Sequence, residues 1–397
     1  MIFRMQKKSP VRERARYRPR NTALVLAGVF SCASVLLAEP CRADEDFQWK
    51  RDAFTATLEG WLNATGAAVT KPGRGDNPRG FLDGGLRAIA TYKTAAGPTI
   101  GARVVGIGDT NTLPTWGDRS IFIQDINHWG RIEGGWRSGL PDALYGYTPN
   151  SYTFVSADYG PDSGYALDPN GQLPTRFLNR RTRREIDAIS YLGLGAALST
   201  DESPKITYTS PRFHGLQFGA SIAPDADDTR RFHFGPSGQM GVVYEYYYGN
   251  NNEIRLGASG SVTDGTRGTD DIYSGNIGAT FIWNNLYYLG LSATAGDGSG
   301  GRTPVPFAER ARGGVVSFNY EPGRWAFGGY FQYASTEDER DPRQSRDLAI
   351  AQIGASWRYV EQWRIFGAVY YYDLDRARNR LDQDDGAVFL IGTRLIL

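Results

Sequence analysis

The sequence predicts an all-β protein: a transmembrane antiparallel β-barrel of sixteen strands with a long third loop folded into the lumen. Segments of about 8–12 residues in which apolar residues alternate with polar or small ones recur along the chain. The connections between these segments alternate between short and long, as in outer-membrane barrels. A mean hydropathy of −0.43 is compatible with this fold, because only every second wall residue of a barrel faces lipid.

Residues 1–43 are predicted to be an export signal that is cleaved after Ala43. They begin with many arginines and lysines, continue with an apolar run over about 22–38, and end with the small residues Cys41 and Ala43. An uncleaved membrane anchor is the alternative. The apolar run is short for a membrane span, and a polar break follows it, so we favour a signal peptide.

Removal of residues 1–43 changes the composition of the chain. That segment holds nine of the 44 Lys/Arg and two of the 43 Asp/Glu, so residues 44–397 carry 35 basic and 41 acidic side chains. Both cysteines, Cys32 and Cys41, leave with it, which excludes disulfides and thiol chemistry from the remainder. Nothing in this charge balance indicates a nucleic-acid partner.

Sixteen strands are predicted between the signal and the C-terminus. They begin near Phe54, Phe81, Pro98, Ser120, Gly130, Ile206, Leu216, Met240, Glu253, Ile272, Leu286, Arg312, Trp325, Asp347, Trp363 and Gly386. The long connections are predicted at about 66–80, 109–119, 138–205, 223–239, 262–271, 296–311, 335–346 and 375–385. The last strand should pair with the first, because an open sheet edge in lipid leaves backbone groups unpaired.

Single strands show two faces. In the strand near residue 86, Leu86, Ala88 and Tyr92 share one face, while Arg87 and Lys93 lie on the other. Tryptophan and tyrosine residues gather beside the short connections, where rings with a polar edge suit the level of the lipid headgroups. We therefore expect the apolar face to meet lipid and the polar face to line the lumen.

The long connection 138–205 concentrates charge of both signs and is several times longer than a usual loop of about 4–6 residues. We interpret it as a constriction loop inside the barrel domain 44–397. Its candidate functional residues are Asp158, Asp162, Asp168, Arg180, Arg181, Arg183 and Arg184. Anion binding, lining of the vestibule and ion pairs with Glu185 and Asp187 all remain open for the arginines.

Two stretches resemble the sixteen-stranded general porins of Gram-negative bacteria: GRIEGGWR at 130–137 and ITYTSPRFHGLQFGAS at 206–221. The resemblance implies a homotrimer through which small hydrophilic solutes and ions diffuse. We expect outer-membrane lipids and lipopolysaccharide around it, and no cofactor or metal. It also implies acids on the inward loop opposite bases on the barrel wall. Wall bases matched in this way are Arg87, Arg103, Arg131 and Arg137, and Glu133 on the same predicted strand as Arg131 is a further candidate for the pore wall. The terminal Leu397 departs from the family's usual Phe, and the Arg-rich insertion at 179–184 has no match.

An outer-membrane porin is therefore the favoured function. A substrate-selective, anion-preferring channel that uses Arg180–Arg184 is the alternative, and an outer-membrane enzyme or adhesin on a barrel scaffold is the alternative of another class. Signals for an enzyme are weak: the three histidines are not spaced as a metal pair, and no G-x-S-x-G elbow occurs. The G-x-G-x-x-G match at 296–301 lies in a predicted loop, where dinucleotide binding is not expected.

Overall fold

A computed structural model describes the greater part of the chain after residue 46. The described residues are 47–70, 80–109, 112–125, 127–137, 139–140, 144, 175, 177–179, 181–183, 185–186, 189, 203–224, 235–249, 251–264, 271–296, 310–337, 345–376 and 384–396. Within them, no helix has both the length and the hydropathy needed to cross a membrane.

The described residues are dominated by seventeen β-strands. Their bounds are β1 Phe47–Arg51, β2 Phe54–Val69, β3 Gly80–Lys93, β4 Thr99–Asp109, β5 Thr112–Asp125, β6 Gly130–Arg137, β7 Ser203–Thr209, β8 Leu216–Ala223, β9 Ser237–Tyr248, β10 Asn252–Thr263, β11 Ile272–Trp283, β12 Tyr287–Gly296, β13 Arg310–Tyr320, β14 Trp325–Glu337, β15 Arg346–Val360, β16 Trp363–Arg376 and β17 Asp384–Ile396.

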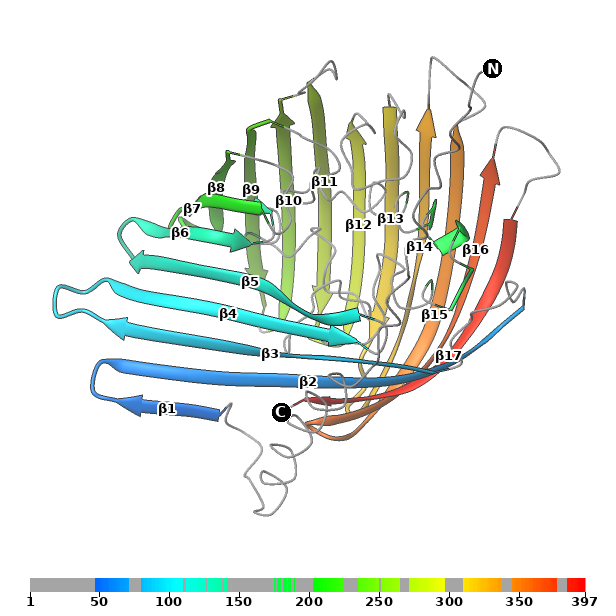
Figure 1. The fold of residues 1–397 in the computed structure, drawn as a ribbon, viewed down its shortest axis with the longest axis horizontal. Coiled ribbons are helices and arrows are strands. Elements are labelled where there is room, and N and C mark those ends of the chain that lie inside the picture. Colours follow the sequence, from blue (N-terminus) through cyan, green and yellow to red (C-terminus); the bar gives the residue numbers. More distant parts are fainter. Residues whose placement is uncertain are drawn as a thin grey trace, which may run out of the picture. The chain divides into compact units, whose positions relative to one another are not determined.

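Strands β2 to β17 close into one antiparallel barrel (Figure 1). Each pairs with the next along the chain, and β17 returns to pair with β2 from Val388↔Val69 to Ile396↔Trp61. Closure gives each strand two neighbours and leaves the barrel without an open edge. The predicted fold class, a sixteen-stranded antiparallel barrel, is confirmed.

The short strand β1 was not predicted. It pairs with the first part of β2, from Arg51↔Phe54 to Phe47↔Leu58. The edge of β2 that β3 leaves free is thus shared by β1 and then by β17. Fifteen of the sixteen predicted strand starts lie within three residues of the observed ones, and the exception is Ser120, because β5 begins at Thr112.

One predicted long connection is wrong. Residues 109–119 were expected to form a loop, but β5 already begins at Thr112, and Thr112 pairs with Asp109 of β4. The pairing of β4 with β5 is irregular here, with register shifts between Val104 and Gly106 and between Ile107 and Asp109. Such bulges interrupt the alternation of apolar and polar residues on which the prediction relied.

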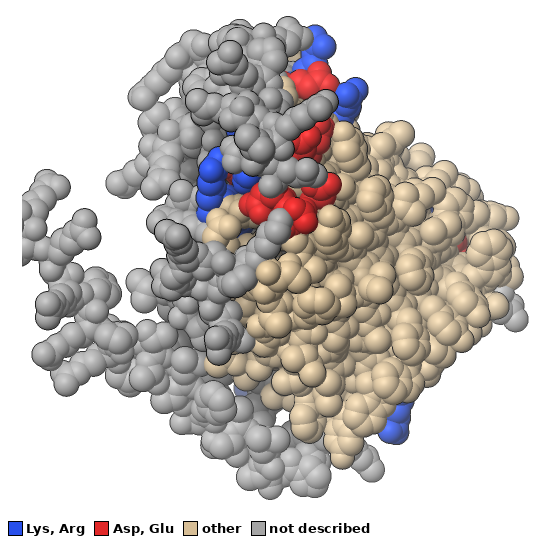
Figure 2. Space-filling view, turned by 90° about the vertical axis from the view of Figure 1, so that its right-hand side faces the viewer, with Lys and Arg blue, Asp and Glu red and all other residues tan. Residues whose placement is uncertain are grey.

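The two faces of the wall differ in chemistry. On β9, Met240 is 73% exposed, whereas the preceding Gln239 is 2% exposed. The same alternation recurs around the barrel, with apolar side chains outward and polar ones inward, as a membrane barrel requires. In Figure 2 one outer face is a broad area of uncharged residues, with the coloured charged atoms gathered mainly at its upper end.

Aromatic side chains form a chain of contacts along the ends of the strands that the short turns connect. Trp325 lies 6.3 Å from Trp357, Trp357 lies 5.5 Å from Tyr359, and Tyr359 lies 5.4 Å from Trp363, all between ring centroids. These rings occupy the outer surface beside the turns, as predicted. Aromatic rings of this kind lie at the level of the lipid headgroups, where water meets the apolar part of the membrane.

Candidate functional site

The inner wall formed by β3 to β7 carries a dense set of charged side chains. The predicted wall residues Arg87, Arg103, Arg131, Glu133 and Arg137 lie there on the inward-facing positions of β3, β4 and β6. In each strand they alternate with exposed apolar residues, which places them on one face.

Glu133 is the centre of one ion-pair group. Its Oε2 lies 2.8 Å from Arg131 Nη2 and 2.6 Å from Arg137 Nη1, and the Ser120 hydroxyl donates to its other oxygen. Glu133 is only 4% exposed, so these charge-assisted contacts replace the water that the carboxylate loses. The Arg131 guanidinium also lies 3.8 Å from the centroid of the Phe122 ring.

A second carboxylate extends the group across β4 and β5. Asp118 Oδ2 lies 3.0 Å from Arg103 Nη2 and 3.5 Å from Arg137 Nε. Arg137 thus contacts both Asp118 and Glu133, and the ammonium of Lys205 on β7 donates to the carbonyl oxygen of Arg137. These side chains form one continuous charged network.

Arg87 stands beside this network with its own partner. Its Nε donates to Glu59 Oε2, and the two residues are directly opposite each other on β3 and β2. The pattern of the sequence predicted the arginines but missed Glu59, Asp118 and Lys205. Asp118 lay in the stretch taken for a loop, whereas Lys205 shares the inward face of Thr207 and could have been found from that alternation.

Among these wall residues positive charge exceeds negative charge. Five are basic, namely Arg87, Arg103, Arg131, Arg137 and Lys205, and three are acidic, namely Glu59, Asp118 and Glu133. Arginine stays charged at any physiological pH, so the excess is permanent.

Described parts of the connection between β6 and β7 lie inside the barrel. Its first described residues lie against the inner faces of β8 and β9. The buried side chains of Leu140 and Leu144 pack with Val243, and the Leu140 backbone N–H donates to Gln239 Oε1 at 2.7 Å. Val243 and Gln239 are buried on the inward-facing side of β9. The connection therefore starts along the inner wall next to its own strands.

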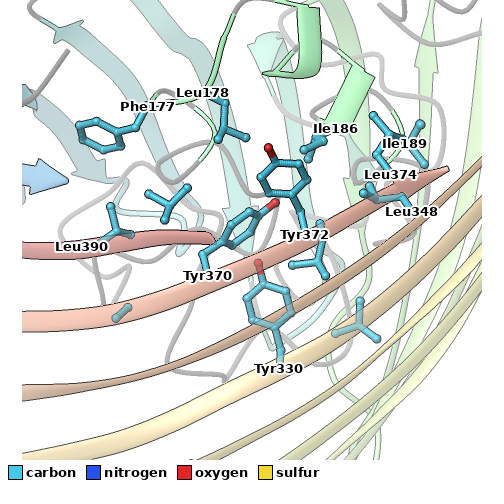
Figure 3. Close-up of a cluster of buried hydrophobic side chains, with 14 of the residues drawn as sticks. Phe177, Leu178, Ile186, Ile189, Tyr330, Leu348, Tyr370, Tyr372, Leu374 and Leu390 are labelled. Carbon is cyan, nitrogen blue, oxygen red and sulfur yellow. The ribbon is translucent and has the colours of Figure 1, made fainter. Parts of the chain in front are cut away.

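Later residues of the same connection pack against another part of the wall (Figure 3). Phe177, Leu178, Ile186 and Ile189 are buried in one hydrophobic cluster with inward-facing residues of β14 to β17. The wall side of the cluster includes Tyr330, Leu348, Ile350, Tyr370, Tyr372, Leu374, Val388 and Leu390. β9 and β16 are seven strands apart around one side of the barrel, so the connection contacts two distant parts of the wall.

A polar contact fixes the helical residues 181–183 and 185–186 beside this cluster. Asn179 caps them, since its Oδ1 accepts from the backbone N–H of Arg181 at 3.1 Å and of Thr182 at 3.0 Å. Glu185 Oε2 then accepts from Arg376 Nε on β16 at 2.5 Å, and the Thr182 hydroxyl donates to Asp384 on β17.

The predicted loop residues are only partly described. Arg181 is largely exposed and its Nε lies 3.3 Å from Glu185 Oε1, one helical turn away. The Arg183 backbone N–H donates to the Asn179 carbonyl at 2.9 Å. Asp158, Asp162, Asp168, Arg180 and Arg184 lie outside the described residues.

A closed barrel with an apolar outer face and a charged inner face defines a class, the transmembrane β-barrels of outer membranes. A family model described as "Gram-negative porin" matches residues 22–392. The chain belongs to the Gram-negative porin family, and its place is the outer membrane, where it forms a porin channel. No curated protein matches it by sequence.

Solved structures share the fold at low sequence identity. OmpT of Vibrio cholerae with loop L8 deleted, titled an outer membrane protein, superposes with a TM-score of 0.58 at 12% identity, covering 87% of this chain and all of that one. OmpT expressed in the outer membrane gives a TM-score of 0.54 at 12% identity, covering 88% of this chain and all of that one. A mutant of the Rh. blastica porin superposes with a TM-score of 0.51 at 16% sequence identity, and the match covers 86% of this chain and 100% of that one.

Proposed function

We propose that this porin allows small hydrophilic solutes and ions to diffuse passively through a water-filled channel, and that it is not an enzyme. The observation that carries this proposal is the contrast between an apolar outer wall and a charged inner wall of one closed barrel. Charges arranged in a narrow aqueous passage select solutes by size and sign without any chemical step.

The charged wall of β3 to β7 is proposed as one side of the selective region. The constriction loop was predicted at 138–205, but β7 already begins at Ser203, so residues 138–202 would form the loop on the other side. Asp158, Asp162 and Asp168 would face the wall arginines. Support comes from the buried contacts of Leu140, Leu144 and the 177–189 residues with the inner wall. A loop fixed at both of these places narrows the lumen between them.

A substrate-selective channel that prefers anions is the second candidate. The excess of basic residues on the β3–β7 wall favours it, because fixed positive charge raises the local concentration of anions. The arginines at 180–184 would add to this effect if they line the vestibule.

Conductance of the purified protein in a planar bilayer tests the proposal, with the reversal potential measured in a salt gradient. Large ohmic steps with weak ion selectivity support a general porin, and small steps blocked by one anion support the selective channel. A preparation that is folded but adds no conductance contradicts both.

Two further parts of the proposal concern maturation and assembly. We propose that cleavage after Ala43 leaves a chain that starts at Asp44, which N-terminal sequencing of outer-membrane protein would reveal. We also propose a homotrimer, for which conductance closing in thirds is the expected result. An N-terminus at Met1 would contradict the proposed cleavage. Closure of the conductance in one step would contradict the proposed homotrimer.

A further inference from the structure

Arg131 is the most exposed of the four arginines predicted for the pore wall. Its side chain is 30% exposed, whereas the side chains of Arg87, Arg103 and Arg137 are 12%, 16% and 11% exposed. Arg131 is the second residue of β6 and lies on the inward face of that strand, beside the outward-facing Ile132. It therefore meets the lumen close to the short turn that joins β5 to β6.

The charged network around Arg131 holds more basic than acidic side chains. Its bases are Arg103, Arg131, Arg137 and Lys205, and its acids are Asp118 and Glu133. Lys205 is only 4% exposed, so most of the positive charge lies behind the surface, next to the two carboxylates. The field of a charge that is paired with an opposite one falls off quickly with distance. The positive excess of the network therefore reaches the lumen chiefly at Arg131.

An aromatic ring and a carboxylate hold Arg131 in place. Phe122 faces inward on β5 and is 5% exposed, and the centroid of its ring lies 3.8 Å from Arg131 Cζ. Arginine binds an aromatic face through cation–π attraction and stacking. Glu133 Oε2, 2.8 Å from Arg131 Nη2, supplies the second contact. The two contacts restrict a long side chain that is otherwise open to the lumen.

The Phe122 ring in turn lies over a glycine. Phe122 is directly opposite Gly101 on β4, and a Cβ added at Gly101 would come within 2.2 Å of Phe122 Cζ. Gly101 is not among the glycines with a positive φ, so its backbone conformation accepts alanine. The approach of the ring is what requires glycine here, and a side chain at this position would displace the ring.

We propose that Arg131 is the specificity-determining residue of the β3–β7 wall, through which the wall acts on small anions in the lumen, and that Phe122 and Gly101 are positioning residues that hold it there. A guanidinium keeps its charge and attracts anions through Coulomb forces. The effect on permeating ions rests on the proposed channel function, whereas the exposure of Arg131 and its contact with Phe122 do not.

Single cysteines test the exposure without any need for conduction, because residues 44–397 contain no cysteine of their own. In the purified full chain, Arg131→Cys should react with a cationic methanethiosulfonate reagent at least about tenfold faster than Arg137→Cys, at a less exposed position of the same strand. Mass spectrometry of proteolytic fragments measures the two rates. Equal rates overturn the proposal.

Reversal potentials in a salt gradient test the charge. Arg131→Gln should shift the permeability ratio toward cations by about fivefold. Arg87→Gln removes the same charge at a side chain that is 12% exposed, and its shift should be smaller. Reaction of Arg131→Cys with the cationic reagent should restore the original ratio. A shift in Arg87→Gln as large as that in Arg131→Gln overturns the proposal.

The positioning role has its own variants. Phe122→Leu and Gly101→Ala change no charge, yet both should shift the ratio toward cations, because they remove or displace the ring that contacts Arg131. Neither should shift it further when combined with Arg131→Gln, whereas Phe122→Tyr keeps the ring and should keep the original ratio. Shifts that persist in the Arg131→Gln background would assign the ring a merely structural role.

The two measurements separate this inference from the proposed function. A channel that conducts with an unchanged permeability ratio in Arg131→Gln refutes the inference alone. A folded protein that adds no conductance refutes the channel, and the labelling rates then still decide whether Arg131 is the exposed arginine of the wall.

Discussion

Glu185, between β6 and β7 in the sequence, and Arg376, on β16, are joined by a contact of 2.5 Å between Oε2 and Nε. The two residues are 191 positions apart in the chain. Arg376 is 5% exposed at its side chain and also lies 3.6 Å from Asp384. This contact holds the connection between β6 and β7 against the far wall of the barrel.

Glu185→Gln should loosen that hold. Loss of the charge weakens the contact of Arg376 with residue 185 and keeps its contact with Asp384, and we expect a cost of about 1–3 kcal/mol for the docked state. Trypsin should then cleave more rapidly after Arg181, which is already exposed. Glu337→Gln is the control, because its pair with Arg312 is exposed. Equal cleavage rates in all three proteins would mean that the contact does not fix the segment.

Ile186→Ala tests the hydrophobic part of the same docking. Ile186 is fully buried, and truncation of a buried isoleucine to alanine costs about 2–5 kcal/mol. Hydrogen exchange of residues 177–189 should accelerate about tenfold or more. Ile277→Ala, at an outward position that is 64% exposed, should leave this exchange unchanged. Unaltered exchange in Ile186→Ala would contradict the packing shown in Figure 3.

Charge on the β3–β7 wall should set ion selectivity. Arg103→Gln removes a positive charge and should shift the permeability ratio toward cations, whereas Asp118→Asn should shift it toward anions. The interaction of a partly water-exposed charge with an ion contributes about 0.3–1 kcal/mol, which corresponds to roughly a two- to fivefold change in the permeability ratio. Reversal potentials in a salt gradient measure both. Shifts of the same sign in the two variants would exclude an electrostatic origin.

The acids of the predicted constriction loop can be tested by the same measurement. Asp158→Asn combined with Asp162→Asn should move selectivity toward anions, if both carboxylates face the wall arginines. Asp271→Asn, directly before β11, is a control outside this connection. An unchanged reversal potential would assign Asp158 and Asp162 to a solvated loop rather than to the constriction.

Gly130 at the start of β6 should be intolerant of a side chain. Its φ of +90° favours glycine, and an added Cβ would come within 2.1 Å of the Thr209 carbonyl oxygen. Gly130→Val should therefore destabilise the barrel by about 1–3 kcal/mol or more. Gly134→Ala on the same strand is the control, because nothing lies within 4 Å of its Cβ position. Gel mobility before and after boiling reports the folded fraction, and equal fractions would contradict the strain at Gly130.

The strands could be predicted because their signal is local. Alternation of apolar and polar residues marks a membrane strand without knowledge of its neighbours. It predicted one shared face for Arg87 and Lys93, and Arg87 and Arg103 alternate with exposed apolar residues in the structure. Contacts such as Glu185 with Arg376 could not be predicted, because they join positions whose separation in the sequence carries no periodic signal. The same holds for the hydrophobic cluster around Ile186, since apolar residues inside a polar lumen run against the expected pattern.

The edge of β2 has a consequence for assembly. β1 covers Phe54 to Leu58 on that edge, and β17 covers Trp61 to Val69, so β2, the strand that begins the barrel, needs β17 as a neighbour. β17 follows every other described strand in the sequence, so the seam between β2 and β17 cannot form before all of those strands have been synthesised. A truncation within β17 would remove the pairing between β17 and β2 and leave the barrel open, because no other strand could close it.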